Sequence, residues 1–230
     1  MNPKSETWLL LHSGPGAADL NMAQDEALLE SAARWTNPVL RFYGWTEGAA
    51  SFGYSQKFGE VARLTMLRPL VRRPTGGGLV PHDADWTYSL VFPPGHWWYA
   101  SRAKESYQRV HEWIRDAFAR LDITTELAPD RRKESAGRCF VGAERFDVLW
   151  HGKKIAGAAQ RRNRQGLLIQ GSVQPPRPLS EGDWQKAVCD VARAKWRVQW
   201  APFGAQTALD QRAEELVRQK YSLAAYTQCR

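Results

Sequence analysis

The chain has 230 residues, of which 43% are hydrophobic, and it carries a formal net charge of +8 at pH 7. This length predicts a single domain over residues 1–230, with a core of about residues 8–175 and a C-terminal helical segment of about residues 180–225. The positive charge favours acidic partners, but no zinc-finger, RNP or homeodomain signature is present, so nucleic acid is not the expected partner.

The first part of the chain is predicted to form short strands around one helix. Residues 8–12 favour a strand, and the turn cluster SGPG at residues 13–16 is expected to end it. Residues 20–33 repeat apolar side chains at helical spacing, and residues 39–43 and 50–54 are strand-like. The apolar run near the N-terminus is too short for a signal peptide core or a membrane span, so we expect a cytoplasmic protein without a membrane partner.

A run of three glycines, Gly76, Gly77 and Gly78, follows Arg73 and Thr75. Consecutive glycines permit positive φ angles and a close backbone approach to a ligand, and their N–H groups can bind an anion. Neither a Walker A motif nor a dinucleotide-binding fingerprint is present. Taken alone, the run is more typical of a flexible hairpin turn.

The clearest helix is predicted at residues 104–121, because Tyr107, Val110 and Ile114 recur on one face. An amphipathic helix of this kind packs against a sheet. Residues 86–92 are the next predicted strand, residues 167–173 are a later one, and the closing helices are expected within residues 184–191 and 207–221. Cys189 falls in the first closing helix and is expected to be a packing residue.

A hairpin is predicted around the turn His151-Gly152, with strands from residues 146–150 and 153–158. It would hold Lys154 on rigid backbone. Cys139 precedes this hairpin, and a thiol becomes nucleophilic only as the thiolate, so a nearby lysine would activate it. A lone cysteine is more often a small buried residue, however, and a lysine pair after a turn is usually solvated.

No metal site is predicted. The three cysteines contain no CxxC pair, and the five histidines are scattered rather than placed at metal-ligand spacing.

Several motifs in this order resemble the lipoate-protein ligase and octanoyltransferase family. They are LRFYGW at 40–45, SFGYSQ at 51–56, RRPTGGG at 72–78, HDADWTYS at 82–89, CF at 139–140, FDV at 146–148 and GKKIAGAAQ at 152–160. The resemblance implies an α+β fold, in which helices flank a mixed or antiparallel central sheet as in class II aminoacyl-tRNA synthetases and biotin-protein ligases. It is nearest to the cysteine-dependent branch, which moves an octanoyl group from acyl carrier protein to a lysine of a lipoyl domain or of glycine cleavage H protein.

Within that resemblance, Cys139 is the expected nucleophile and Lys154 its catalytic partner. Lys154 would lower the pKa of the thiol, assist proton transfer and hold the acyl carbonyl. No cofactor is expected for this activity. The residues expected to bind substrate are Arg73, Thr75, Gly76, Gly77, Gly78, His82, Gly157, Ala158 and Ala159.

Two departures leave alternatives open. Gly78 is the ligase-like residue where many transferases carry arginine, which keeps an ATP-dependent lipoate-protein ligase using Mg-ATP in view. Gln170 stands where the family usually has histidine, which keeps a non-catalytic binding protein of the same fold in view.

Overall fold

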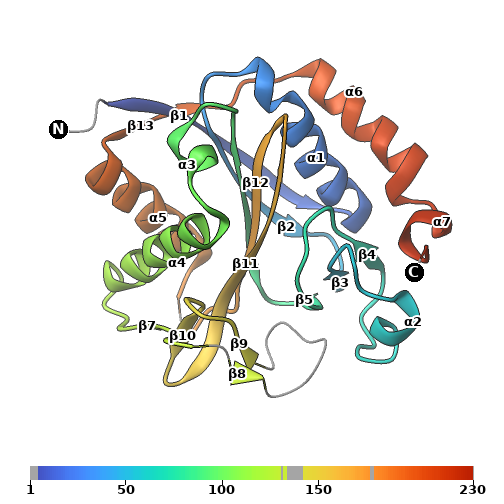
Figure 1. Cartoon of the computed structure of the whole chain (residues 1–230), viewed down its shortest axis with the longest axis horizontal. Helices are drawn as coiled ribbons and strands as arrows, with labels where there is room; N and C mark the ends of the chain where they lie inside the picture. Colours follow the sequence, from blue (N-terminus) through green and yellow to red (C-terminus); the bar gives the residue numbers. More distant parts are fainter. Residues whose placement is uncertain (1–4, 131, 134–141, 177–178, 230) are drawn as a thin grey trace.

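A computed structural model describes residues 5–130, 132–133, 142–176 and 179–229. Its largest sheet has the strand order β13-β1-β2-β6-β12-β11-β10-β7 (Figure 1). β1 is parallel to β2 and β13, whereas the other neighbours in this sheet are antiparallel, so the sheet is mixed as predicted. The strand bounds are β1 Glu6–Gly16, β2 Val39–Trp45, β6 Trp86–Phe92, β7 Glu126–Leu127, β10 Val148–Trp150, β11 Lys153–Asn163, β12 Gly166–Val173 and β13 Val198–Pro202.

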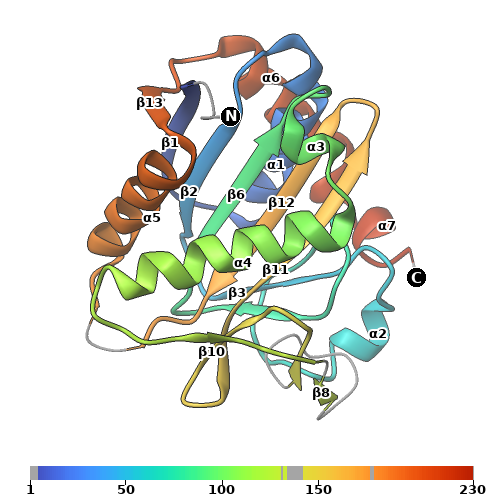
Figure 2. The same cartoon turned by 60° about the vertical axis from the view of Figure 1, so that its left-hand side comes forward.

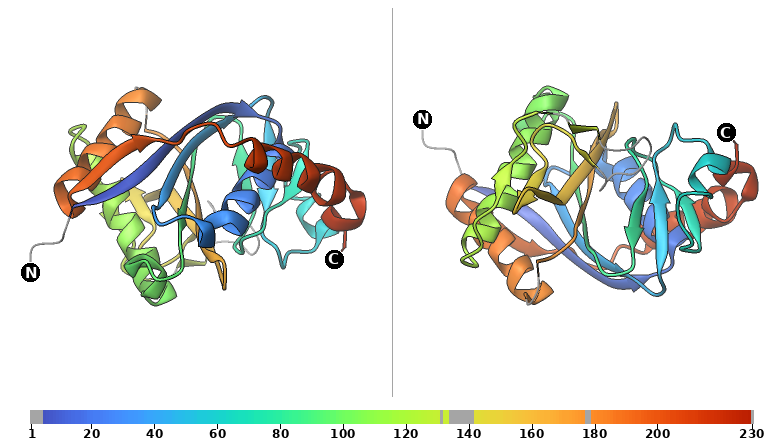
Figure 3. Two further views of the ribbon diagram at one scale, coloured as in Figure 1. Left: turned by 90° about the horizontal axis from the view of Figure 1, so that it is seen from above. Right: turned by 90° about the horizontal axis from the view of Figure 1, so that it is seen from below.

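A smaller sheet has the order β4-β3-β5, with β3 parallel to β4 and antiparallel to β5. It lies on the same side of the molecule as α2 and the C-terminus, away from α4 and α5 (Figure 3). Its strands are β3 Ala49–Phe52, β4 Leu70–Arg72 and β5 Val80–His82, and a separate short pair joins β8 Arg132–Lys133 to β9 Gly142–Ala143.

Two helical layers cover the two faces of the large sheet (Figures 1 and 2). Side chains alternate between the faces of a strand, so Leu40 and Phe42 of β2 point to one core while Val39 and Tyr43 point to the other. α4 and α5 cover the first face, and α1 and α6 cover the second. The helices are α1 Ala18–Ser31, η1 Ala32–Arg34, α2 Phe58–Val61, α3 Trp97–Ala100, α4 Ala103–Ala119, α5 Glu181–Trp196, α6 Thr207–Leu216, η2 Val217–Tyr221 and α7 Ala224–Thr227.

The long helix and the hairpin around His151-Gly152 are confirmed as α4 and as β10–β11, with positive φ at both turn residues. The prediction that β1 ends before its turn cluster was wrong. Gly14 has φ of +65° and lies at a bulge, so the strand continues to Gly16 along β2. β13 was not predicted and pairs in parallel with β1. Among the described residues, no helix has the length and apolar character needed to cross a membrane.

Candidate active site

A cavity of about 420 Å³, its open mouth included, lies where the small sheet meets the large one. Its walls come from α1, β2, β3, β5, β6, β11 and β12 and from the arginine that follows β4. Arg73, His82 and the small residues Gly157, Ala158 and Ala159 are the predicted substrate-binding residues that line it directly. Concave, mostly apolar sites lined by a few polar groups are typical ligand sites in proteins.

Lys154 packs against Gly157, a residue that lines this cavity. Its side chain is only 4% exposed, so the solvated alternative does not hold. A Cβ added to Gly157 would lie 2.7 Å from Lys154 Cε and 2.8 Å from Nζ, which places the lysine side chain across a glycine that lines the cavity. The absence of a side chain at Gly157 therefore leaves room for the ammonium group.

Asp147 holds this ammonium group in place. Lys154 Nζ lies 2.7 Å from Asp147 Oδ2, and the carboxylate is fully buried. The carboxylate also accepts hydrogen bonds from the Tyr107 hydroxyl and from the Glu144 N–H. Sequence reasoning recognised Asp147 only as part of a motif; its place at the start of β10, opposite the lysine of β11, is the signal that points to its role.

His111 faces the same carboxylate, with Nε2 at 3.9 Å from Asp147 Oδ1. Its Nδ1 lies 2.7 Å from the Tyr107 carbonyl oxygen, an arrangement in which Nδ1–H donates and Nε2 carries a lone pair. Burial lowers the pKa of His111 below its ordinary value of 6.5, and the nearby Asp147 charge opposes this only in part. The ring is therefore neutral at neutral pH.

The Arg73 side chain holds the glycine run in place by hydrogen bonds to its carbonyl oxygens. Arg73 donates to the Gly76 and Gly78 carbonyl oxygens, from Nη2 at 2.6 and 2.7 Å. Gly77 has φ of +88°, and a Cβ there would lie 2.9 Å from Arg73 Nη2. The predicted substrate-binding residues Thr75, Gly76, Gly77 and Gly78 are not among the residues that line the cavity. They lie behind that lining, where Gly77 packs against Ala159.

Arg72, beside Arg73, is fully buried and serves another part of the chain. It donates to the carbonyl oxygens of Tyr226 and Thr227 at 3.2 and 2.9 Å, and to those of Tyr54 and Gln56. The Arg72 guanidinium group therefore links the segment just before the glycine run to the C-terminal helix α7.

Gln170 lines the cavity from β12. Its Nε2 donates to Asp25 Oδ2 at 2.7 Å, and its Oε1 accepts from the Thr75 hydroxyl at 2.7 Å. Asp25 in turn forms a fully buried ion pair with Arg41. The amide therefore joins the glycine run to a buried network on α1 and β2.

Cys139, the predicted nucleophile, lies outside the described residues. Cys189 is buried in α5, and burial raises the pKa of its thiol to about 11, which fits the packing role predicted for it. Among the cysteines that the structure describes, Cys229 is exposed.

Residues 17–174 match the family model described as the lipoyl protein ligase A/B catalytic domain. The octanoyltransferase LipM of Kyrpidia tusciae is 36% identical over 180 residues, covering 73% of this chain, and LipM of Bacillus subtilis is 33% identical over 183 residues, covering 74%. The chain spans 66% of the length of these curated relatives.

Solved structures support the fold. A putative lipoate protein ligase from T. acidophilum superimposes with a TM-score of 0.78 at 20% identity, covering 98% of this chain and 100% of that one. A lipoate-protein ligase A bound with ATP gives 0.77 at 19% identity, covering 97% and 98%. A bipartite lipoate protein ligase studied with its E2 lipoyl domain, also from T. acidophilum, gives 0.75 at 20% identity, covering 97% and 96%.

Proposed function

Because this chain belongs to the lipoyl protein ligase A/B catalytic domain family, we propose that it is an octanoyltransferase of lipoate assembly. The Cys139 thiolate attacks the carbonyl carbon of octanoyl-acyl carrier protein; the new C–S bond forms as the bond to the carrier's sulfur breaks, and the carrier leaves as its thiolate. A lysine amine of a lipoyl domain or of glycine cleavage H protein then attacks this thioester, which forms the amide and releases the Cys139 thiol. Thioester exchange is nearly isoenergetic, so the reaction needs no ATP.

The observation that carries the proposal is the buried Lys154 ammonium group, which packs against Gly157 in the lining of an apolar cavity. Glycine and alanine at positions 157 to 159 leave space for an alkyl chain along β11. With the chain in the cavity, the acyl carbonyl would stand near the lysine. An ammonium group in a site shielded from water strongly stabilises a thiolate and the oxyanion that forms during acyl transfer.

The Asp147 contact refines the role of Lys154. Asp147 Oδ2 lies 2.7 Å from Lys154 Nζ and fixes the position of the ammonium group. The role that this geometry favours is electrostatic stabilisation of the thiolate and the oxyanion. In the second step, one proton of the attacking amine passes to the sulfur that leaves.

The partners we propose are an acyl carrier protein and a lipoyl-domain or H-protein lysine. Such carriers are typically acidic, and the net charge of +8 would steer them toward this chain. An E2 lipoyl domain is named with one of the structurally similar ligases.

Intact-mass measurement after incubation with octanoyl-acyl carrier protein tests the proposal. We expect one added octanoyl group, removed by neutral hydroxylamine as thioesters are, and lost in Cys139→Ala. Cys189→Ala is the matched control and should keep the adduct, because that thiol is buried in the packing of α5. Transfer to a lipoyl domain that persists in Cys139→Ala would contradict the mechanism.

The ATP-dependent ligase is the second candidate, favoured by Gly78 and by the fold shared with a ligase bound to ATP. It predicts pyrophosphate release when lipoate and Mg-ATP are added. The octanoyltransferase predicts no pyrophosphate and an acyl adduct without ATP.

A further inference from the structure

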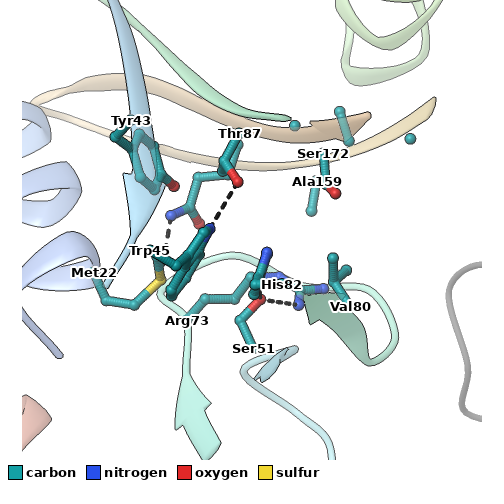
Figure 4. Close-up of a pocket in the computed structure, with 14 residues that line it drawn as sticks. Met22, Tyr43, Trp45, Ser51, Arg73, Val80, His82, Thr87, Ala159 and Ser172 are labelled. Carbon is teal, nitrogen blue, oxygen red and sulfur yellow. Dashed lines mark hydrogen bonds between the residues drawn. The ribbon is translucent and has the colours of Figure 1, made fainter. Parts of the chain in front are cut away.

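Two side chains that line the cavity, Ser51 and His82, form an unbroken chain of hydrogen bonds with the buried carboxylate of Asp85. Ser51 Oγ lies 2.8 Å from His82 Nε2, and His82 Nδ1 lies 2.8 Å from Asp85 Oδ2. Ser51 comes from β3, His82 ends β5, and Asp85 stands just before β6. Ser51 and His82 both line the cavity, across from Ala159 and Ser172 (Figure 4).

The direction of each hydrogen bond follows from groups that can only donate or only accept. The Arg73 guanidinium donates from Nη1 to Ser51 Oγ at 3.3 Å, so the serine proton is free to point at His82 Nε2. The Asp85 carboxylate only accepts, so His82 donates to it from Nδ1–H. His82 therefore presents the lone pair of Nε2 to the serine hydroxyl, which is the tautomer that a general base requires.

The imidazole and the carboxylate are both fixed by their surroundings. The His82 ring stacks on Trp45, with ring centroids 3.8 Å apart. Asp85 Oδ2 also accepts from the hydroxyls of Thr87 and Ser172, at 3.0 and 2.6 Å. Asp85 Oδ1 is buried and has no hydrogen-bond partner in the part of the chain that the structure describes. This arrangement holds the base in one orientation before any substrate arrives.

From this geometry we infer that Ser51, His82 and Asp85 form a catalytic triad that hydrolyses thioesters or esters of medium-chain acids bound in the cavity. Ser51 Oγ attacks the acyl carbonyl as its proton passes to His82 Nε2, and His82 gives that proton to the leaving sulfur or oxygen. Water then attacks the serine ester, giving a proton to His82, and the Ser51 oxygen leaves with that proton. The net reaction consumes one water and releases the acid and the thiol or alcohol.

Arg73 supplies the charge stabilisation that such a triad needs. Its guanidinium lies beside Ser51 Oγ and is held by the Gly76 and Gly78 carbonyl oxygens. A fixed positive group next to the nucleophile stabilises the oxyanion of the tetrahedral intermediate. The inference rests on the proposed function only in that an acyl chain binds in this cavity; it does not depend on Cys139.

A fluorophosphonate probe, which phosphonylates activated serines, tests the triad in the 230-residue chain carrying Cys139→Ala. We expect one label, mapped by peptide mass analysis to Ser51, and hydrolysis of p-nitrophenyl octanoate. Ser51→Ala and His82→Gln should each lower this hydrolysis by about 100-fold or more. Ser55→Ala is the matched control, since this exposed serine lies four residues away and outside the cavity, and it should leave the rate unchanged.

Mapping of the label requires no variant of the triad, so the test stands even where a substitution weakens the fold. Absence of a label on Ser51, or hydrolysis that survives both Ser51→Ala and His82→Gln, would overturn the inference. Hydroxylamine separates it from the transferase: an oxyester on Ser51 resists the neutral reagent, whereas a thioester on Cys139 is cleaved. A serine label without a cysteine adduct defeats only the transferase, and a cysteine adduct without a serine label defeats only the triad.

Discussion

Replacing Asp147 with asparagine should destabilise the protein far more than a surface change of the same chemistry. The carboxylate is fully buried and lies 2.7 Å from a lysine that is 4% exposed. Asparagine keeps the shape but removes the negative charge that lies 2.7 Å from the buried ammonium group. Breaking one side of a buried pair costs about 3–5 kcal/mol of unfolding free energy.

The chain contains a matched control for this prediction. Asp190 and Lys186 in α5 are separated by a similarly short distance, 2.6 Å, but the lysine side chain is 76% exposed. Asp190 also pairs with Arg193, whose Nη1 lies 2.6 Å from Asp190 Oδ1 and whose side chain is 54% exposed. Asp190→Asn breaks both of these pairs with exposed cations, and should therefore change the unfolding free energy by only about 1 kcal/mol.

Urea unfolding of both variants, together with Lys154→Met and the Asp147→Asn/Lys154→Met double variant, measures the effect. The double variant has no unpaired buried charge, so we expect it to be less destabilised than the sum of its two single changes by at least about 1 kcal/mol. A loss for Asp147→Asn no larger than that for Asp190→Asn would refute the reasoning. Additive single changes would refute it as well.

Three further predictions follow from the site. Gly157→Ala should displace Lys154 and lower octanoyl transfer by about 100-fold, whereas Gly182→Ala, whose added methyl meets nothing within 4 Å, should not; steady-state rates compare them. Burial lowers the pKa of His111, so below about pH 6.5 the unfolded chain binds a proton that the folded chain does not. The free energy of unfolding should therefore decrease as the pH is lowered. His111→Gln should flatten that fall in urea unfolding at acid pH, and an unchanged slope would contradict the assignment. Arg72→Met should release α7, seen as faster cleavage of the C-terminal segment by a protease, with no such change for the exposed Arg68→Met.

The sequence was sufficient to predict those elements whose conformation depends on neighbouring residues. The turn His151-Gly152 adopts positive φ and sets the β10–β11 hairpin, and the apolar spacing of α4 gives its buried face. β13 was not predicted because it pairs with β1, for example Val198 with Glu6. The residues around Val198 give no local signal for a contact with a segment so distant in the sequence. The bulge at Gly14 was likewise read as the end of a strand.

The site was predicted in part. Arg73, His82 and Gly157 to Ala159 were named from motifs and do line one cavity, although their roles remain predictions, as does the role of Cys139. Ser51 and Asp85 were not linked to His82, because only the meeting of β3 with β5 brings the three together. Asp147 was overlooked as a partner of Lys154 for the same reason: their contact crosses a hairpin rather than a helix turn.

The late position of β13 has a consequence during synthesis. β1 pairs with β2 on one side, and on the other side Glu6 to Leu10 pair, in the described part of the chain, with β13, nearly 200 residues downstream. Until that segment leaves the ribosome, a run containing Trp8, Leu9 and Leu10 presents an open strand edge, which invites pairing with other chains. Products that stall or terminate before β13 should therefore aggregate and depend on chaperones. This holds even though β11, which carries Lys154, and β12, which carries Gln170, have already been synthesised.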